Sequence, residues 1–302
     1  MRTFLLILAW ATTTLELFGS EPTADDNPPV QVKLTEKTAL VFASASEGRE
    51  ILGRHDAYIE SLAALERQIR LHSDKPVSIE EFVAHVQKQV LPWGEEDHKL
   101  LASVASSLSE RMKELALPAP EQVLLIQTTG KDESDAAYTR GAAIVLPRKR
   151  IELKPNALER LLAHELFHVI SRHDAELRKQ LYAIIGFQPC NPIVLPDELA
   201  KRQITNPDAP TVDFSIDVEH DGEELSVVPI LLAEPAEFDS KRKRLFDYLQ
   251  FRLLVIEPAE DDWKAKLVDG QPLLIDGRTC ESYREQIGRN TQYIIHPDEI
   301  LA

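Results

Sequence analysis

The spacing of apolar residues predicts helices in the first part of the chain. Between residues 47 and 116, apolar side chains recur every three or four positions, as they do on the buried face of a helix. Ser78 and Glu81 form a capping box that opens one of these helices. The pattern therefore predicts a mainly helical region over 31–118, which is either a support domain or a pro-segment that is removed later.

The pattern changes at Pro118–Pro120, after which short strands are expected. Val123–Gln127 predicts a strand, and Ala136–Leu146 predicts a second strand with Gly141 inside it. Further predicted elements are a helix over Asp174–Gly186, a strand over Phe246–Glu257, a hairpin at Asp269–Gly270 and a short helix over Glu281–Gly288. This mixture of helices and strands indicates an α+β fold, with 119–302 as its second region.

The run from Asn156 to Arg172 predicts a buried helix. Pro155 precedes Asn156, which is a good N-cap residue, and Glu159 completes a pair that resembles a capping box. Apolar residues cover much of the helix circumference, and no Gly or Pro interrupts the run. We therefore expect this helix to pack under a sheet.

Two histidines of this helix are spaced to bind one metal ion. Residues four apart lie one above the other on a helix, so His164 and His168 share a face, and Glu165 lies beside them. This H-E-x-x-H arrangement is typical of zinc hydrolases, in which the Glu reaches a water on the ion. The alternative is a pair of core histidines with satisfied hydrogen bonds, and the capped, apolar helix favours the metal site.

A catalytic zinc needs a third protein ligand. Ser171 stands where a metzincin has Gly, and Asp174 suits the cap of the following helix. Glu299 is the better candidate, because Pro297 favours the first turn of a helix from which Glu299 projects. The alternative is that Glu299 only stabilises the N-terminus of that helix through its dipole.

With these residues the chain resembles the gluzincin zinc metallopeptidases, the thermolysin-like class. The resemblance rests on the H-E-x-x-H helix, on the strand before it and on the end of the chain. It implies a zincin-like catalytic domain over 119–302, with a small mixed sheet and zinc bound by His164, His168 and Glu299. In that class the strand before the helix often borders the cleft, where an extended peptide can pair with it.

The second motif of the gluzincins is a Glu followed four residues later by an Asp that orients a zinc-bound His. The printed sequence ends three residues after Glu299, so no Asp stands at that spacing. Either the supporting Asp is absent or the chain continues beyond Ala302.

The resemblance implies a zinc metallopeptidase whose substrate is a peptide or protein. Glu165 takes a proton from a water on the zinc ion and later returns it to the leaving amine. His296, Tyr293 and Tyr138 are candidates for the donor to the oxyanion or for substrate contacts. Two alternatives stay open: a zinc hydrolase of a non-peptide amide, such as a cell-wall bond, and a non-catalytic exported binding protein.

The charge of the chain bears on its partners. Fifty acidic against thirty-four basic side chains give a net charge of −16. Such a surface repels phosphate backbones and anionic lipid, so we expect no nucleic-acid partner and no peripheral membrane binding.

The first residues predict export. Met1-Arg2 precedes an apolar stretch over residues 4–11 that is too short to span a bilayer. We expect a signal peptide over 1–20 and a polar linker over 21–30, hence a secreted or periplasmic protein with no stable membrane anchor after signal removal. In an exported protein, Cys190 and Cys280 are able to form a disulfide, although two cysteines do not establish one.

Overall fold

The computed structural model describes residues 30–112, 115, 117–260 and 262–302. The predicted signal peptide over 1–20 lies outside the described residues, as does the predicted linker except for its last residue, Val30. None of the helices among the described residues is long and apolar enough to cross a membrane.

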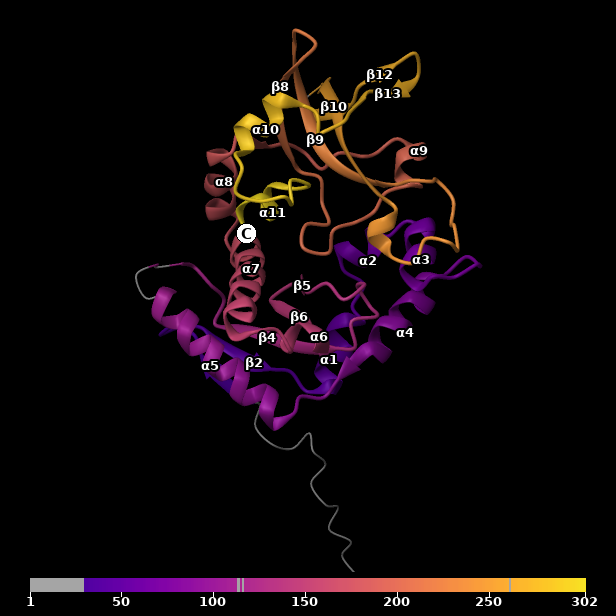
Figure 1. Ribbon diagram of the computed structural model, residues 1–302. Coiled ribbons are helices and arrows are strands. Elements are labelled where there is room, and N and C mark those ends of the chain that lie inside the picture. Colours follow the sequence, from indigo (N-terminus) through magenta and orange to yellow (C-terminus); the bar gives the residue numbers. More distant parts are fainter. Residues whose placement is uncertain (1–29, 113–114, 116, 261) are drawn as a thin grey trace, which may run out of the picture.

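Two sheets lie at opposite ends of the protein, and helix α7 (Pro155–His173) rises between them (Figure 1). The first sheet has the strand order β1-β2-β4-β6-β5, with β3 paired to β4. Its strands are β1 (Gln31–Lys33), β2 (Ala39–Phe42), β3 (Val90–Leu91), β4 (Gln122–Thr128), β5 (Tyr138–Arg140) and β6 (Ala143–Pro147). It is a mixed sheet, because β2, β4 and β6 run parallel while the other pairs are antiparallel.

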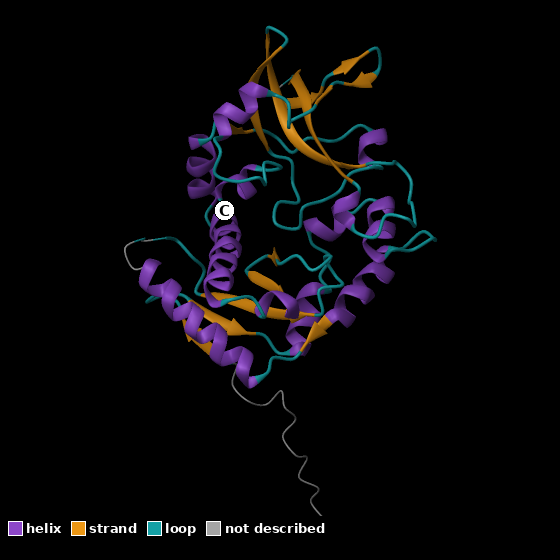
Figure 2. Ribbon diagram, viewed as in Figure 1, coloured by secondary structure: helices purple, strands orange, loops and turns teal. Residues whose placement is uncertain are grey.

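The second sheet is antiparallel and has the order β11-β10-β9-β8-β7, with β14 paired to β10. Its strands are β7 (Phe187–Pro189), β8 (Phe214–His220), β9 (Glu223–Ala233), β10 (Leu249–Ala259), β11 (Asp262–Ala265) and β14 (Leu274–Ile275). Beside it, β12 (Leu267–Val268) and β13 (Gln271–Pro272) form the predicted hairpin around Asp269–Gly270. Helices and sheets together confirm the α+β class (Figure 2).

The helices cover both sheets (Figure 1). Before α7 they are α1 (Ala45–Leu52), α2 (Ala57–Ser61), α3 (Ala64–Leu71), α4 (Ile79–Gln89), α5 (Glu95–Met112) and α6 (Arg148–Ile151). After α7 they are α8 (Ala175–Ile184), α9 (Asp197–Ala200), the 3-10 turn η1 (Leu245–Asp247), α10 (Glu281–Ile287) and α11 (Pro297–Leu301). The predicted capping box of Ser78 and Glu81 is present at α4, and Asp174 caps α8 as expected.

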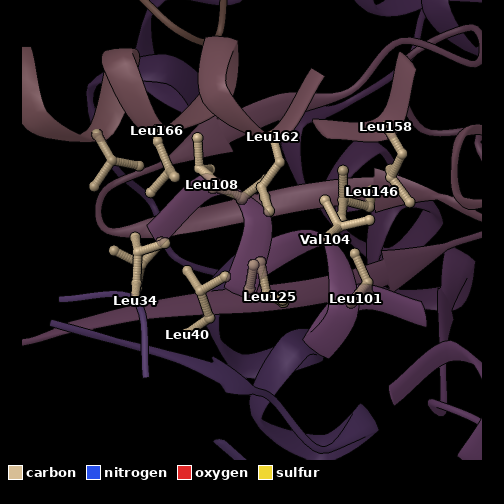
Figure 3. Packing of buried hydrophobic residues seen from close by; sticks show 14 of the residues in the cluster. Leu34, Leu40, Leu101, Val104, Leu108, Leu125, Leu146, Leu158, Leu162 and Leu166 are labelled. Atoms are coloured by element: carbon tan, nitrogen blue, oxygen red, sulfur yellow. The ribbon is translucent and has the colours of Figure 1, made fainter. Parts of the chain in front are cut away.

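The main core fixes α7 against the first sheet. Successive strand residues point to opposite faces, so Leu125 faces α5 and α7 while Ile126 faces α1 and α4. Leu158, Leu162 and Leu166 of α7 meet leucines of β4, β6 and α5 in this core (Figure 3). Another side of α7, which carries His164 and Glu165, lines a cavity.

The first sheet includes strands from both sides of position 118. β2 pairs in parallel with β4, and β1 pairs with β2. Residues 31–118 therefore contribute strands to the same sheet that supports α7, in addition to their helices.

Two local predictions were wrong. The segment Ala136–Leu146 is a hairpin rather than one strand, because Gly141 adopts a φ of +58° in the turn between β5 and β6. Asn156 does not cap α7: the helix begins at Pro155, whose fixed φ suits the first helical position. Glu159 instead forms an ion pair with Arg111 at 2.8 Å.

Cys190 and Cys280 are free thiols in the structure. Cys280 belongs to the core between the second sheet, α8 and α10, whereas Cys190 borders a separate cluster around α9. No disulfide therefore joins the segment after α7 to the C-terminal region.

Candidate metal centre

The structure brings three predicted ligand atoms together. His164 Nε2 lies 3.1 Å from His168 Nε2 and 3.5 Å from Glu299 Oε2, and His168 Nε2 lies 3.9 Å from the same carboxylate oxygen. Bonds of about 2.0–2.2 Å to a tetrahedral ion separate its ligand atoms by about 3.3–3.6 Å. The three distances bracket this range, so the set can hold a metal ion.

Helix α11 carries Glu299 to the histidines. Pro297 occupies its first position, and His296 Nδ1 accepts a hydrogen bond from the Asp298 backbone N–H at 3.1 Å, which caps the helix. Ile300 anchors the helix in the core of the second sheet. Glu299 is buried, and Asn206 donates a hydrogen bond to its Oε1 at 2.7 Å. That contact leaves Oε2 to face the imidazoles.

Asp298 orients His168, a role that the sequence did not reveal. Its Oδ2 lies 2.7 Å from His168 Nδ1, and its Oδ1 accepts hydrogen bonds from the Ser171 hydroxyl at 2.7 Å and the Tyr182 hydroxyl at 2.6 Å. A proton on Nδ1 directs the lone pair of Nε2 toward the metal position. The Asp that lies against a histidine of the candidate site is therefore Asp298, directly before Glu299 and not four residues after it. The only sequence signal was an acidic residue adjacent to Glu299.

The surroundings of the histidines are strongly acidic. Glu165, Asp208, Asp298 and Glu299 are all buried within this cluster. Burial lowers the pKa of His168, but the charge of Asp208, the hydrogen bond and charge of Asp298 and the charge of Glu299 outweigh it and raise the pKa to about 10. Buried carboxylates at this density favour a bound cation, so the electrostatics fit a metal ion as well as the distances do.

Glu165 stands beside the three ligands without belonging to that set. Its side chain is buried, and its Oε2 has no hydrogen-bond partner among the described residues. Burial, together with the charge of Asp208, raises the pKa of the Glu165 carboxyl well above its usual range. An uncompensated buried carboxylate oxygen is costly unless water or a ligand meets it. Glu165 Oε2 is thus free to accept a hydrogen bond from a water or ligand in the cavity that Glu165 lines.

Asp208 is hydrogen-bonded to the outer edge of β5. Its Oδ1 accepts hydrogen bonds from the Thr139 backbone N–H at 2.6 Å and from the Thr139 hydroxyl at 2.7 Å. Arg172 donates to the carbonyl of Gly141 and to the carbonyl of Asp208, both at 2.7 Å. Asp208 also lies close enough to Glu165 and His168 to form a second group of potential ligands. The Thr139 N–H, with which an added peptide strand would pair, is therefore already bonded to Asp208.

A cavity of about 620 Å³ opens on the metal centre. His164, Glu165 and Glu299 line it at one place. The remaining walls come from Arg70, from residues 133–138, from the α6–α7 region, from residues 204–208, from the second sheet and η1, and from residues 290–302. A cavity of this size suits a ligand of a few residues.

The three candidates for the oxyanion donor or for substrate contacts lie in different surroundings. Tyr138 lines the cavity but donates its hydroxyl to Asp132 at 2.9 Å. His296 is buried and does not line this cavity. Tyr293 lines the cavity, is 60% exposed and has no hydrogen bond from its hydroxyl to any described residue. Of the three, Tyr293 alone offers the cavity a free donor.

The fold and the site together define an α+β protein with a candidate centre of two imidazoles and one carboxylate. Comparison with protein families finds a match to the eCIS core domain over residues 128–176, which include β5, β6, α6 and the whole of α7. The match covers His164, Glu165 and His168 but ends well before Glu299. No curated protein and no solved structure matches the chain.

Replacing Asp298 by Asn should weaken metal binding. The amide keeps the shape of the carboxylate but loses the charge that fixes the His168 tautomer, and loss of such support typically costs about 10–100-fold in metal affinity. We expect this loss in zinc competition titrations against a chromophoric chelator. Asp217→Asn, an exposed site in β8 that accepts a hydrogen bond from Ser226, should bind zinc as the parent does. An unchanged affinity in Asp298→Asn would contradict the role given to Asp298.

Proposed function

We propose that this protein is a zinc metallopeptidase of the gluzincin type. One observation carries the proposal: the three ligand atoms converge as a tetrahedral ion requires, while the free oxygen of Glu165 stands beside them. Two imidazoles and one carboxylate form a ligand set used by catalytic zinc, with a fourth position for water or substrate.

The residues divide the chemistry among themselves. When bound, zinc supplies Lewis acidity, which makes a water more acidic and polarises the carbonyl of the substrate. Glu165 accepts the proton of the attacking water and later delivers it to the leaving amine. Its buried position keeps the carboxylate poorly solvated and therefore basic.

Other side chains prepare the site for this reaction. Asp298 holds the His168 ring in one orientation, and Asn206 does the same for the Glu299 carboxylate. Tyr293 is the proposed donor to the oxyanion that forms at the carbonyl, because its hydroxyl is free and lies on the cavity wall. These contacts position groups before the substrate arrives, which lowers the reorganisation that the reaction requires.

The same proposal includes export of the protein. The short apolar stretch over residues 4–11, behind Arg2, supports a signal peptide, and the acidic composition suits a soluble enzyme that acts on peptides rather than on nucleic acid.

Metal analysis of the purified full-length protein tests the proposal directly. We expect one zinc ion per chain, peptide hydrolysis that stops when a chelator removes the metal, and recovery when zinc is added back. Glu299→Gln should reduce the zinc content, because it weakens the third ligand. A purified protein that binds no zinc, or a zinc-loaded protein that cleaves no peptide in a diverse library, would refute the proposed function.

A further inference from the structure

In this structure, groups of the protein occupy the backbone positions at β5 and the turn after it with which a substrate strand would pair. The outward N–H of Thr139 is bonded to Asp208, and the nearby carbonyl of Gly141 is bonded to Arg172. A peptide that added a strand there would have to displace two buried or half-buried ionic groups. Recognition must therefore come from side chains of the cavity wall.

Two arginines on that wall have unused donors. Arg160 of α7 is exposed toward the cavity and makes no hydrogen bond or ion pair with any described residue. Arg150 of α6 uses only its Nε, which donates to the carbonyl of Asp135 at 2.6 Å. Arg70 also lines the cavity, but it is already paired with two buried glutamates. Arg150 and Arg160 are thus the free guanidinium groups among the described lining residues.

The position of Arg160 on α7 places it away from the candidate metal centre. Arg160 precedes His164 by one turn, and long side chains on a helix lean toward its N-terminus. Apolar residues line the same wall: Leu153, Ala157 and Leu161. An extended substrate advances by about 3.3 Å per residue. A group bound by Arg160 therefore lies a few residues from the scissile bond, which the proposed function places beside Glu165.

The charges along the cavity are divided. The metal end is rich in buried carboxylates, among them Glu165, Asp208 and Glu299, whereas the α6–α7 wall carries the free arginines. The free arginines attract a substrate carboxylate to the α6–α7 wall. Arginine binds carboxylates through paired hydrogen bonds, which gives orientation as well as affinity.

We propose that Arg150 and Arg160 select substrates that carry a carboxylate a few residues from the scissile bond. This inference rests on the proposed function, since it names the substrate class of the same site. The carboxylate is either an acidic side chain or the C-terminal carboxylate of a short peptide. In both cases the arginines are specificity-determining residues and take no part in the chemistry.

Peptide binding to zinc-loaded Glu165→Gln tests the inference without turnover. The probes are fluorescein-labelled hexapeptides with Glu or Gln at each position in turn, each made with a free or an amidated C-terminus. We expect the carboxylate forms to bind about tenfold more tightly than their neutral partners, as measured by fluorescence anisotropy. The position of the preferred Glu, or a preference for the free C-terminus, identifies the source of the carboxylate.

Arginine variants in the same background decide whether the cavity wall is responsible. Arg160→Gln should reduce the preference to within about twofold, and Arg160→Lys should restore part of it because the charge returns. Arg150→Gln should also reduce the preference. If Arg150→Gln does not fold, the result for Arg160→Gln alone decides. Arg49→Gln, at an exposed arginine of α1 outside the cavity, should keep the full preference.

The outcomes separate this inference from the proposed function. Equal binding of carboxylate and neutral peptides, or a preference that survives Arg160→Gln, overturns the inference even where the parent protein hydrolyses peptides. Selective binding that depends on Arg160, with no hydrolysis by the parent, supports the carboxylate site and overturns the peptidase.

Discussion

Replacing Glu165 by Gln should lower kcat for the proposed peptide hydrolysis by about 10²–10⁴-fold, the contribution expected of a positioned general base. The amide has the size of the carboxylate and fits the same buried position, but it cannot accept the proton of the attacking water. Because Glu165 lies outside the ligand set of His164, His168 and Glu299, the zinc content should stay at that of the parent. Steady-state kinetics and metal analysis on the same preparation measure both quantities.

A second glutamate of α7 provides the matched control. Glu159 forms an ion pair with Arg111 and accepts a hydrogen bond from the Ser107 hydroxyl, both of α5, and it does not line the cavity. Glu159→Gln should therefore leave kcat and zinc content unchanged. A Glu165→Gln protein that retains kcat within threefold of the parent shows that Glu165 is not the base. Loss of zinc from that variant instead assigns Glu165 to the second group of potential ligands, with His168 and Asp208.

Much of the metal centre could be predicted because its residues follow helical periodicity. His164 and His168 are four residues apart on one helix, so their proximity depends only on local geometry. Glu299 was found through the chemistry of its own helix, where Pro297 marks the first turn. The position of Glu299 beside the histidines, however, depends on the packing of Ile300 of α11 in the core of the second sheet. No local sequence pattern predicts this packing.

The residues that support the ligands could not be predicted either, because tertiary packing determines their contacts. Asn206 and Asp208 belong to a loop whose turn chemistry indicates only that it bends, and their contacts with Glu299 and Thr139 are set by tertiary packing. Asp298 supports His168 across 130 positions in the sequence. The resemblance to gluzincins led us to expect a supporting Asp four residues after Glu299, whereas the residue directly before Glu299 lies against His168.

The two local predictions were wrong because, at each place, two signals in the sequence favoured different structures. An apolar run continues from Ala143 past Ile144, which favoured one strand, but a glycine at the first position of a two-residue turn also favours a hairpin. At the start of α7, Pro155 at the first helical position outweighed the capping preference of Asn156. The pairing of β2 with β4 joins distant segments in parallel, and the sequence holds no short-range signal for it.

The largest expected change in stability comes from Arg70→Met. Arg70 and Glu66 form a buried ion pair at 2.7 Å, and the same guanidinium is paired with Glu133 and donates to the carbonyl of Thr205 at 2.8 Å. This cluster joins α3 to segments on both sides of α7. Methionine fills the space but leaves two buried carboxylates without a cation, which should lower the free energy of unfolding by about 3–5 kcal/mol. Urea denaturation followed by tryptophan fluorescence measures the loss.

The matched control and the pH dependence test the cause of that loss. Arg54 and Glu50 have the same spacing at 3.2 Å, but their side chains are 62% and 75% exposed, so Arg54→Gln should cost no more than about 1 kcal/mol. Burial already raises the pKa of Glu66 in the parent while Arg70 opposes that rise, so removing Arg70 raises the pKa further. A group whose pKa is higher in the folded state favours folding at low pH, and this contribution is lost as the pH rises. The difference between Arg70→Met and the parent should therefore shrink as the pH falls from 8 toward 5; a difference that grows, or one below about 1 kcal/mol at pH 8, contradicts a buried, charge-compensating role for Arg70.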